Sequence, residues 1–294
     1  MKLELLLCIF ISKKIMNKFD MNRLTGLASG FEKLDAVTNG WQNGNLIVIA
    51  GRPAMGKTAF ALSLVRNMAI EKKIPVAMFS LELSKVPLVN RLIVNVSRVS
   101  SGRIKSGQLE KTDWENIETG VSSMLGAPLY VDDSPTLSVS NLRVKARELV
   151  RDYGVKMIII DYLQLMNMPG GSSESRQEEV ATISRSLKLL ARELDIPVMA
   201  LSQLNRSMEQ TSSNNPDCMR PKLSDLRESG AIEQDADMVC FIHRPEYYRI
   251  MKDLNSNDTK GVAEIIIAKH RHGAVGDVRL HFDKEHAAFT NEKN

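Results

Sequence analysis

The sequence predicts an α/β fold in which helices cover both faces of a twisted, mainly parallel sheet. Short apolar runs, each typical of a strand buried on both faces, recur along the chain. Helical patterns, with apolar residues three and four positions apart, separate most of these runs. The chain has 294 residues, of which 43% are hydrophobic, and no internal repeat or second core-forming region is visible. We therefore expect one large domain.

The strand and helix assignments follow the order of the chain. Strands are expected at residues 46–50, 76–80, 129–132, 157–161, 197–203, 238–242, 262–268 and 278–282. Helices are expected from 56 to 68, within 84–127, around 142–151 and from 177 to 195. A Thr112-x-x-Glu115 capping box is expected inside the second of these helical regions. Glycine and polar residues predict a turn-rich lead-in over residues 24–41.

Composition sets bounds on the function. The net charge of +4 is too small to indicate nucleic-acid binding by itself. The three cysteines are far apart and form no Cys-x-x-Cys pair, so neither a disulfide framework nor a zinc site is expected. This usage suits a reducing, cytoplasmic compartment. The apolar run Leu5–Ile11 is too short to span a bilayer, and no small-residue cleavage site follows it. We expect no membrane association.

A glycine-containing loop between the first strand and the first long helix carries the main functional signal. Its residues are Gly51, Arg52, Pro53, Ala54, Met55, Gly56, Lys57, Thr58 and Ala59. The pattern is a Walker A motif in its required strand–loop–helix context, in which backbone N–H groups surround phosphate oxygens. Lys57 would reach the β- and γ-phosphates, and the Thr58 hydroxyl would bind Mg²⁺. A plain glycine-rich turn leaves both of these residues unexplained.

Three polar residues stand at the carboxyl ends of strands, where open parallel sheets bind ligands. Asp161 ends the apolar run Met157–Ile160, as in a Walker B strand, and would hold Mg²⁺, partly through water. Glu82 could polarise a water for attack on the γ-phosphate, or it could simply begin the next helix. Gln203 could sense the γ-phosphate, or it could be an ordinary exposed strand end.

Two cations, Lys269 and Arg271, are two positions apart on an expected strand and should therefore point the same way. They could act as fingers on the nucleotide of a neighbouring subunit. The alternative is a solvated basic edge, which is the simpler account of this spacing when it is considered alone.

Six segments of the chain, taken together, resemble one family, the bacterial replicative DNA helicases of the DnaB type. They are residues 51–61, 80–84, 160–165, 201–206, 225–237 and 268–273. The block Asp225–Asp237, which reads DLRESGAIEQDAD, is the most specific of them. The resemblance covers about residues 23–290 and implies a RecA-like P-loop NTPase motor domain over residues 23–294.

The resemblance also implies a function. Members hydrolyse ATP with Mg²⁺ and move 5′–3′ along single-stranded DNA as homohexameric rings that unwind duplex DNA. Carried over to this sequence, Glu82 becomes the general base, Gln203 the γ-phosphate sensor, and Lys269 and Arg271 the pair that reaches the adjacent subunit's ATP. Arg227, Glu228 and Gly230 match a loop that contacts the DNA backbone, with Arg176 close by. Such contacts would be independent of base sequence and sensitive to salt.

The sequence departs from the family at its N-terminus. Family members normally carry an N-terminal helical domain that supports the ring and meets primase, and only about 22 residues precede the motor here. Residues 1–22 could form a helix that docks on a neighbouring subunit. A helicase loader remains a possible partner, whereas the expectation of primase contact is weakened. The alternatives are a RecA-like DNA-binding ATPase and a truncated motor that does not unwind, and unwinding of a forked duplex separates them from a helicase.

Overall fold

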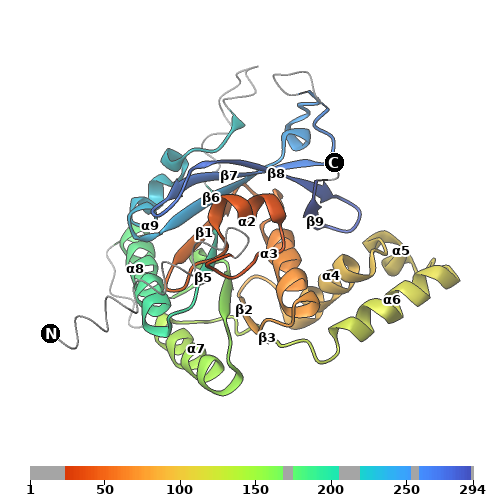
Figure 1. The fold of residues 1–294 in the computed structure, drawn as a ribbon, viewed down its shortest axis with the longest axis horizontal. Helices are drawn as coiled ribbons and strands as arrows, with labels where there is room; N and C mark the ends of the chain where they lie inside the picture. The colour runs from red at the N-terminus through yellow and green to blue at the C-terminus, as the bar shows by residue number, and fades with distance from the viewer. Residues whose placement is uncertain (1–23, 168–174, 205–218, 253–257, 293–294) are drawn as a thin grey trace.

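A single twisted sheet forms the centre of the protein (Figure 1). The computed structural model describes residues 24–167, 175–204, 219–252 and 258–292. In this part of the chain the sheet has nine strands in the order β3-β2-β4-β5-β1-β6-β7-β8-β9. The strands are β1 (Leu46–Gly51), β2 (Val76–Ser80), β3 (Leu129–Asp132), β4 (Met157–Asp161), β5 (Val198–Gln203), β6 (Met238–His243), β7 (Val262–His270), β8 (Gly276–Asp283) and β9 (Ala288–Asn291). The strands from β3 to β6 pair in parallel, and β7, β8 and β9 add antiparallel pairs.

Helices cover both faces of this sheet (Figure 1). They are α2 (Glu32–Thr38), α3 (Lys57–Val65), α4 (Lys85–Ser97), α5 (Ser101–Ser106), α6 (Lys111–Met124), α7 (Val139–Tyr153), α8 (Arg176–Leu194) and α9 (Gly230–Asp235). Ile47 and Ile49 of β1 share one buried cluster with α3, whereas Val48 shares the other with α7 and α8. Successive residues of a strand point to opposite faces, so β1 contributes to two cores. The α/β class and the layered arrangement are confirmed.

Some local expectations are corrected. The lead-in contains the helix α2, which begins after Phe31 without a side-chain cap. The strand β9 has no counterpart among the expected strands. The expected capping box at Thr112 is wrong. The helix α6 begins at Lys111, so its N-cap is Glu110 and Thr112 lies inside the helix. The Glu110 backbone N–H donates to the Asp113 carboxylate at 2.9 Å. The segment 1–22 lies outside the described residues.

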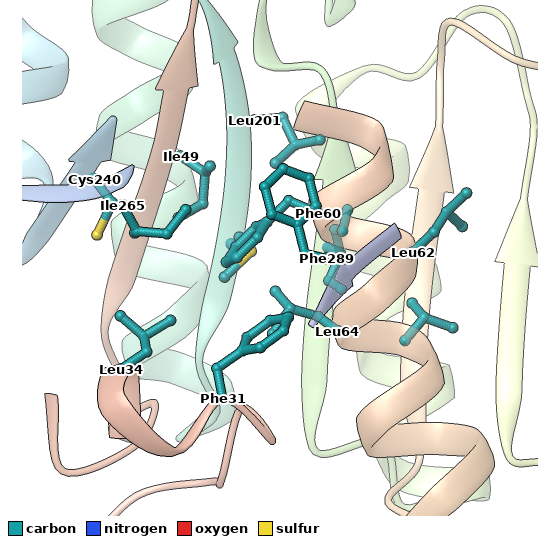
Figure 2. Packing of buried hydrophobic residues seen from close by; sticks show 14 of the residues in the cluster. Phe31, Leu34, Ile49, Phe60, Leu62, Leu64, Leu201, Cys240, Ile265 and Phe289 are labelled. Atoms are coloured by element: carbon teal, nitrogen blue, oxygen red, sulfur yellow. The ribbon is translucent and has the colours of Figure 1, made fainter. Parts of the chain in front are cut away.

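Three aromatic rings pack α2 and β9, the two elements that were not expected from the sequence, against α3 (Figure 2). Phe60 of α3 stacks on Phe31 with ring centroids 5.5 Å apart, and it meets Phe289 of β9 edge-on at 5.4 Å. All three side chains are fully buried. Ser63 of α3 adds a hydrogen bond, because its hydroxyl accepts the Phe289 backbone N–H at 2.9 Å. Residues near both ends of the described chain therefore stabilise the helix that follows the Walker A loop.

We expect the substitution Phe289→Ala to lower the free energy of unfolding by about 3–5 kcal/mol, the usual cost of emptying a buried aromatic site. Urea denaturation measures this change. Val275→Ala serves as the control, because the Val275 side chain is 62% exposed and should lose little stability. A loss below about 1 kcal/mol for Phe289→Ala would contradict the packing described here.

No helix in the described ranges is both long enough and apolar enough to cross a membrane.

Candidate nucleotide-binding site

The loop between β1 and α3 carries the Walker A residues and enters the helix through a glycine. Gly56, the N-cap of α3, has φ +95°, in the region that favours glycine. A Cβ atom at this position would lie 3.3 Å from the Phe289 ring, so a side chain would also crowd the aromatic cluster. The Lys57 ammonium donates to the carbonyls of Gly51 at 2.8 Å and Arg52 at 3.2 Å. Its charge therefore lies inside the loop, beside the helix N-terminus that attracts anions.

Thr58 and Asp161 meet at the centre of this edge of the sheet. The Thr58 hydroxyl donates to Asp161 Oδ2 at 2.8 Å, and Asp161 is only 1% exposed. The pKa of the Asp161 carboxyl is raised to about 6, mainly by burial and in smaller part by the charge of Glu82, against the Thr58 hydrogen bond and the charge of Lys57, which lower it. Burial also lowers the pKa of Lys57, against the attraction of Asp161 and Glu82. These oxygens are the donor type that Mg²⁺ prefers, so the residue set fits that ion.

Glu82 lies next to this pair and outside any helix. Its charge acts on both Lys57 and Asp161, and the neighbouring Leu81 N–H donates to the Asp161 carbonyl at 2.7 Å. The alternative that Glu82 begins the next helix is wrong, because α4 begins at Lys85 with Ser84 as its N-cap. The Glu82 side chain is exposed to solvent.

Gln203 ends β5 opposite Gly51 of β1 in the sheet register, which puts it beside the Walker A loop. Gln164, a residue to which sequence reasoning gave no role, holds this strand end. Its side-chain amide donates to Ser202 Oγ at 2.9 Å and to the Gln203 carbonyl at 3.1 Å. The sequence signals for Gln164 are its position three residues after Asp161 and its place in the family-like segment 160–165.

The Arg52 side chain points away from the phosphate loop. Its Nη1 donates to the Tyr248 hydroxyl at 3.0 Å, and its guanidinium lies 5.4 Å from the centre of that ring. The residue is 5% exposed, and its Nη2 has no hydrogen-bond partner among the described residues. Arg52 can therefore serve a nucleotide through its backbone, while its side chain fixes the loop against the segment after β6.

The carboxyl end of β6, next to the Walker A strand, contains a buried histidine that should make stability depend on pH. Burial, and then the nearby charges of Arg220 and Arg52, lower the pKa of His243 from 6.5 to about 4. Between these values the unfolded chain binds a proton that the folded protein does not. His243 therefore does not lower the free energy of unfolding above about pH 6.5. As the pH falls from 6.5 toward 4, the free energy of unfolding decreases by roughly 3 kcal/mol because of this residue.

Urea denaturation at several pH values between 7.5 and 4.5 measures this slope. The variant His243→Gln is neutral throughout, so its stability should fall less steeply with acid than that of the parent chain. Equal slopes for the two proteins would contradict this account.

Lys269 and Arg271 lie near the amino ends of the parallel strands, opposite the carboxyl ends that carry the Walker A loop. The Lys269 ammonium donates to the carbonyls of Glu233, Gln234 and Ala236, at the C-terminal end of α9, the Ala236 distance being 2.7 Å. Arg271 also donates to the Gln234 carbonyl, at 2.5 Å, and its Nη1 lies 3.2 Å from Asp237 Oδ1. The two side chains thus point the same way, as expected, but only Lys269 lies on the strand, because β7 ends at His270 and Arg271 follows it.

The position of this pair follows from the register of the sheet. Asp237 precedes β6 and its backbone N–H donates to the carbonyl of Leu46, at the amino end of β1. The Walker A loop leaves the carboxyl end of the same strand, roughly 16 Å away for a strand of this length. Lys269 and Arg271 therefore cannot reach the phosphate loop of their own chain.

The residues expected to contact DNA lie on the face of the sheet that α8 and α9 cover. Gly230 begins α9 and is exposed. Arg176 begins α8, is exposed, and donates to the Gln164 carbonyl and to Glu179. Arg227 and Glu228 lie in the 3₁₀ helix Leu223–Ser229, and their side chains are outside the described part. Residues 168–174 and 205–218, which were expected to form loops, also lie outside the described residues.

Fold and site together define a P-loop domain of RecA-like architecture. The family model for the DnaB-like helicase C-terminal domain matches residues 26–291. The chain therefore belongs to that family, and the resemblance found in the sequence is confirmed.

Individual relatives agree with this assignment. The replicative DNA helicase DnaB of Geobacillus stearothermophilus is 47% identical over 268 residues, and replicative DNA helicase DnaC of Bacillus subtilis is 44% identical over 268. These alignments cover 91% of this chain and 57% of each relative, so the chain spans little more than half the length of these curated relatives. The solved ATPase domain of G40P superposes with a TM-score of 0.87 at 38% identity, covering 97% of both chains. A DnaB-like replicative helicase, studied with its interactions with primase, gives a TM-score of 0.86 and 38% identity over 97% of this chain and 66% of its own.

Proposed function

We propose that this chain is the ATP-hydrolysing motor of a replicative DNA helicase and that it works as a head-to-tail ring, a homohexamer by analogy with its family. The observation that carries this proposal is the separation of two groups of residues along the sheet. The phosphate loop, Glu82 and Asp161 lie at one end of β1, and Lys269 and Arg271 lie at the other. A subunit that presents both groups completes an ATP site only with a neighbour.

Each residue at the shared ATP site would have a separate role in hydrolysis. Backbone N–H groups of the loop and the Lys57 ammonium would bind the phosphates, and Thr58 and Asp161 would hold Mg²⁺. The ion would neutralise charge that develops on the phosphate oxygens. Glu82 would accept the proton of the attacking water, and Gln203 would contact the γ-phosphate. Arg271 and Lys269 of the adjacent subunit would stabilise the charge of the transition state.

The proposed track is single-stranded DNA. Gly230, Arg227, Glu228 and Arg176 belong to one face of the sheet, which supports a common path for the strand along α8 and α9. Six copies of a few backbone contacts would hold DNA despite the net charge of only +4. Binding would be independent of base sequence, movement would run 5′–3′, and the protein would act in the cytoplasm. A helicase loader is a further proposed partner, whereas primase contact in this family depends on an N-terminal domain.

ATP hydrolysis measured against protein concentration, with and without single-stranded DNA, tests the proposal. The specific rate should rise as subunits assemble and rise again when DNA is added. A rate that is independent of both concentration and DNA would contradict it.

A second candidate, a RecA-like ATPase that binds DNA without unwinding it, shares the same phosphate site. The Asp225–Asp237 block, the segment that most specifically resembles the replicative helicases, favours the first candidate and lies within the matched residues 26–291. Displacement of a labelled strand from a forked duplex distinguishes the two, because the second candidate and a truncated motor would hydrolyse ATP without releasing the strand.

A further inference from the structure

Asp237 is a buried carboxylate outside the phosphate site that accepts hydrogen bonds from three different parts of the fold. Its side chain is 3% exposed, and both of its carboxylate oxygens are used. Oδ2 accepts the Leu46 backbone N–H at 2.8 Å and the Lys188 ammonium at 2.5 Å, and Oδ1 accepts Arg271 Nη1 at 3.2 Å. The backbone of Asp237 also bonds to both Leu46 and Arg271. One carboxylate thereby connects β1, α8 and the end of β7.

These contacts define the position of Arg271. The residue follows the last residue of β7, and its side chain is 43% exposed. The Asp237 carbonyl accepts the Arg271 backbone N–H at 2.8 Å, and the carboxylate and the Gln234 carbonyl each accept from its guanidinium. A guanidinium has five N–H donors in a rigid plane, so donors remain for a ligand outside the subunit.

We propose that Asp237 is the positioning residue for Arg271, holding its guanidinium at the angle needed to meet the ATP of the adjacent subunit. This inference rests on the proposed function. Because Asp237 also accepts the Leu46 backbone N–H at the start of β1, it links Arg271 to the strand that leads to the subunit's own phosphate loop. Lys188, which also donates to the Gly44 carbonyl at 2.8 Å, balances the buried charge and keeps the carboxylate in place.

The substitution Asp237→Asn separates the contact with Arg271 from the contacts with Leu46 and Lys188. An amide has one acceptor oxygen and one donor nitrogen, whereas the carboxylate here faces donors on both oxygens. The amide oxygen keeps Leu46 and Lys188, and its NH₂ group then faces the Arg271 guanidinium, which is also a donor. The variant therefore removes the carboxylate contact to the Arg271 guanidinium while it keeps the contact with β1, and the hydrogen bonds from Arg271 to the Asp237 and Gln234 carbonyls remain.

We expect Asp237→Asn to lower kcat for DNA-stimulated ATP hydrolysis by about 10–100-fold, the scale of a small misplacement of a catalytic group, and to leave KM for ATP within about threefold. The double variant Asp237→Asn/Arg271→Ala should be no slower than Arg271→Ala alone, because both changes remove one interaction. Asp235→Asn is the matched control. It makes the same change of charge two residues away, with no hydrogen bond to Arg271 in the described structure, and its kcat should stay within about twofold.

Mixed rings distinguish a positioning role from a general defect. A Lys57→Ala subunit has a disabled phosphate loop but an intact Asp237 and Arg271. Asp237→Asn subunits should therefore regain part of their ATPase activity when they are assembled with Lys57→Ala subunits, which supply the finger in trans.

Each other outcome overturns the inference in a recognisable way. If Arg271→Ala leaves kcat unchanged, the proposed function fails and this inference fails with it. If Arg271→Ala lowers kcat while Asp237→Asn has the same kcat as the control Asp235→Asn, the proposed function stands and the positioning role is wrong. If mixing gives no recovery, or if both Asp237→Asn and Asp237→Glu are unfolded in thermal melts, Asp237 serves the fold.

Discussion

The variant Arg271→Ala should bind ATP but hydrolyse it about 10³-fold more slowly than the parent chain, at the low end of the range for arginine fingers. The physical reason is the position of the side chain. Arg271 lies at the amino end of β1 and cannot touch the phosphates held by its own loop, so its loss leaves nucleotide binding intact. Asp237 keeps Lys188 and the Leu46 N–H, so the buried carboxylate does not become unpaired.

Two measurements check this result: steady-state ATP hydrolysis with single-stranded DNA, and the affinity for a fluorescent ATP analogue. Arg192→Ala is the matched control, because Arg192 lines the same surface cavity as Arg271 and the substitution removes the same type of side chain. The control should hydrolyse ATP at close to the parent rate. An Arg271→Ala variant with the parent rate, or with weakened nucleotide binding, would contradict a role in trans.

The variant Glu82→Gln should lose about 10²–10⁴-fold in hydrolysis, the usual contribution of a general base. The substitution keeps the size of the side chain and removes its ability to accept a proton. Glu82 is exposed beside Asp161 and Lys57, so no core packing is lost. Removal of its negative charge from this edge of the sheet should leave ATP binding equal or tighter.

Single-turnover hydrolysis and nucleotide affinity together test this expectation. The control Glu115→Gln makes the same change on α6, at a side chain that is 63% exposed and distant in the chain from the loop. Hydrolysis by Glu82→Gln within a few-fold of the parent rate would assign the base to another residue.

Local sequence patterns predicted most of the fold. The strands at 76–80 and 129–132 match β2 and β3, because each is a short apolar run bounded by turn residues. The helix α2 and the strand β9 were missed because their stability comes from contacts between distant residues. Phe31 and Phe289 pack on Phe60, and this packing cannot be read from a seven-residue helix or a four-residue strand alone.

The candidate site was predictable to a similar extent. Lys57, Thr58 and Asp161 were found because a contiguous motif and a strand end carry them, and the hydrogen bond between Thr58 and Asp161 agrees with their expected proximity. The roles of Gln164 and Asp237 were not predictable, because each depends on the pairing of strands far apart in the sequence. The attachment of Lys269 to the end of α9 likewise depends on how β7 pairs with β6, where the register shifts at Val239.

Mixed rings of Glu82→Gln and Arg271→Ala subunits give the most direct test of an ATP site shared between subunits. Each variant alone should be nearly inactive. In a random mixture, about a quarter of the interfaces of a head-to-tail ring combine an intact phosphate loop with an intact finger, so the mixture should recover up to about that fraction of the parent rate. A mixture no faster than either variant alone, with rings present, would show that each subunit hydrolyses ATP without its neighbour and would contradict the account.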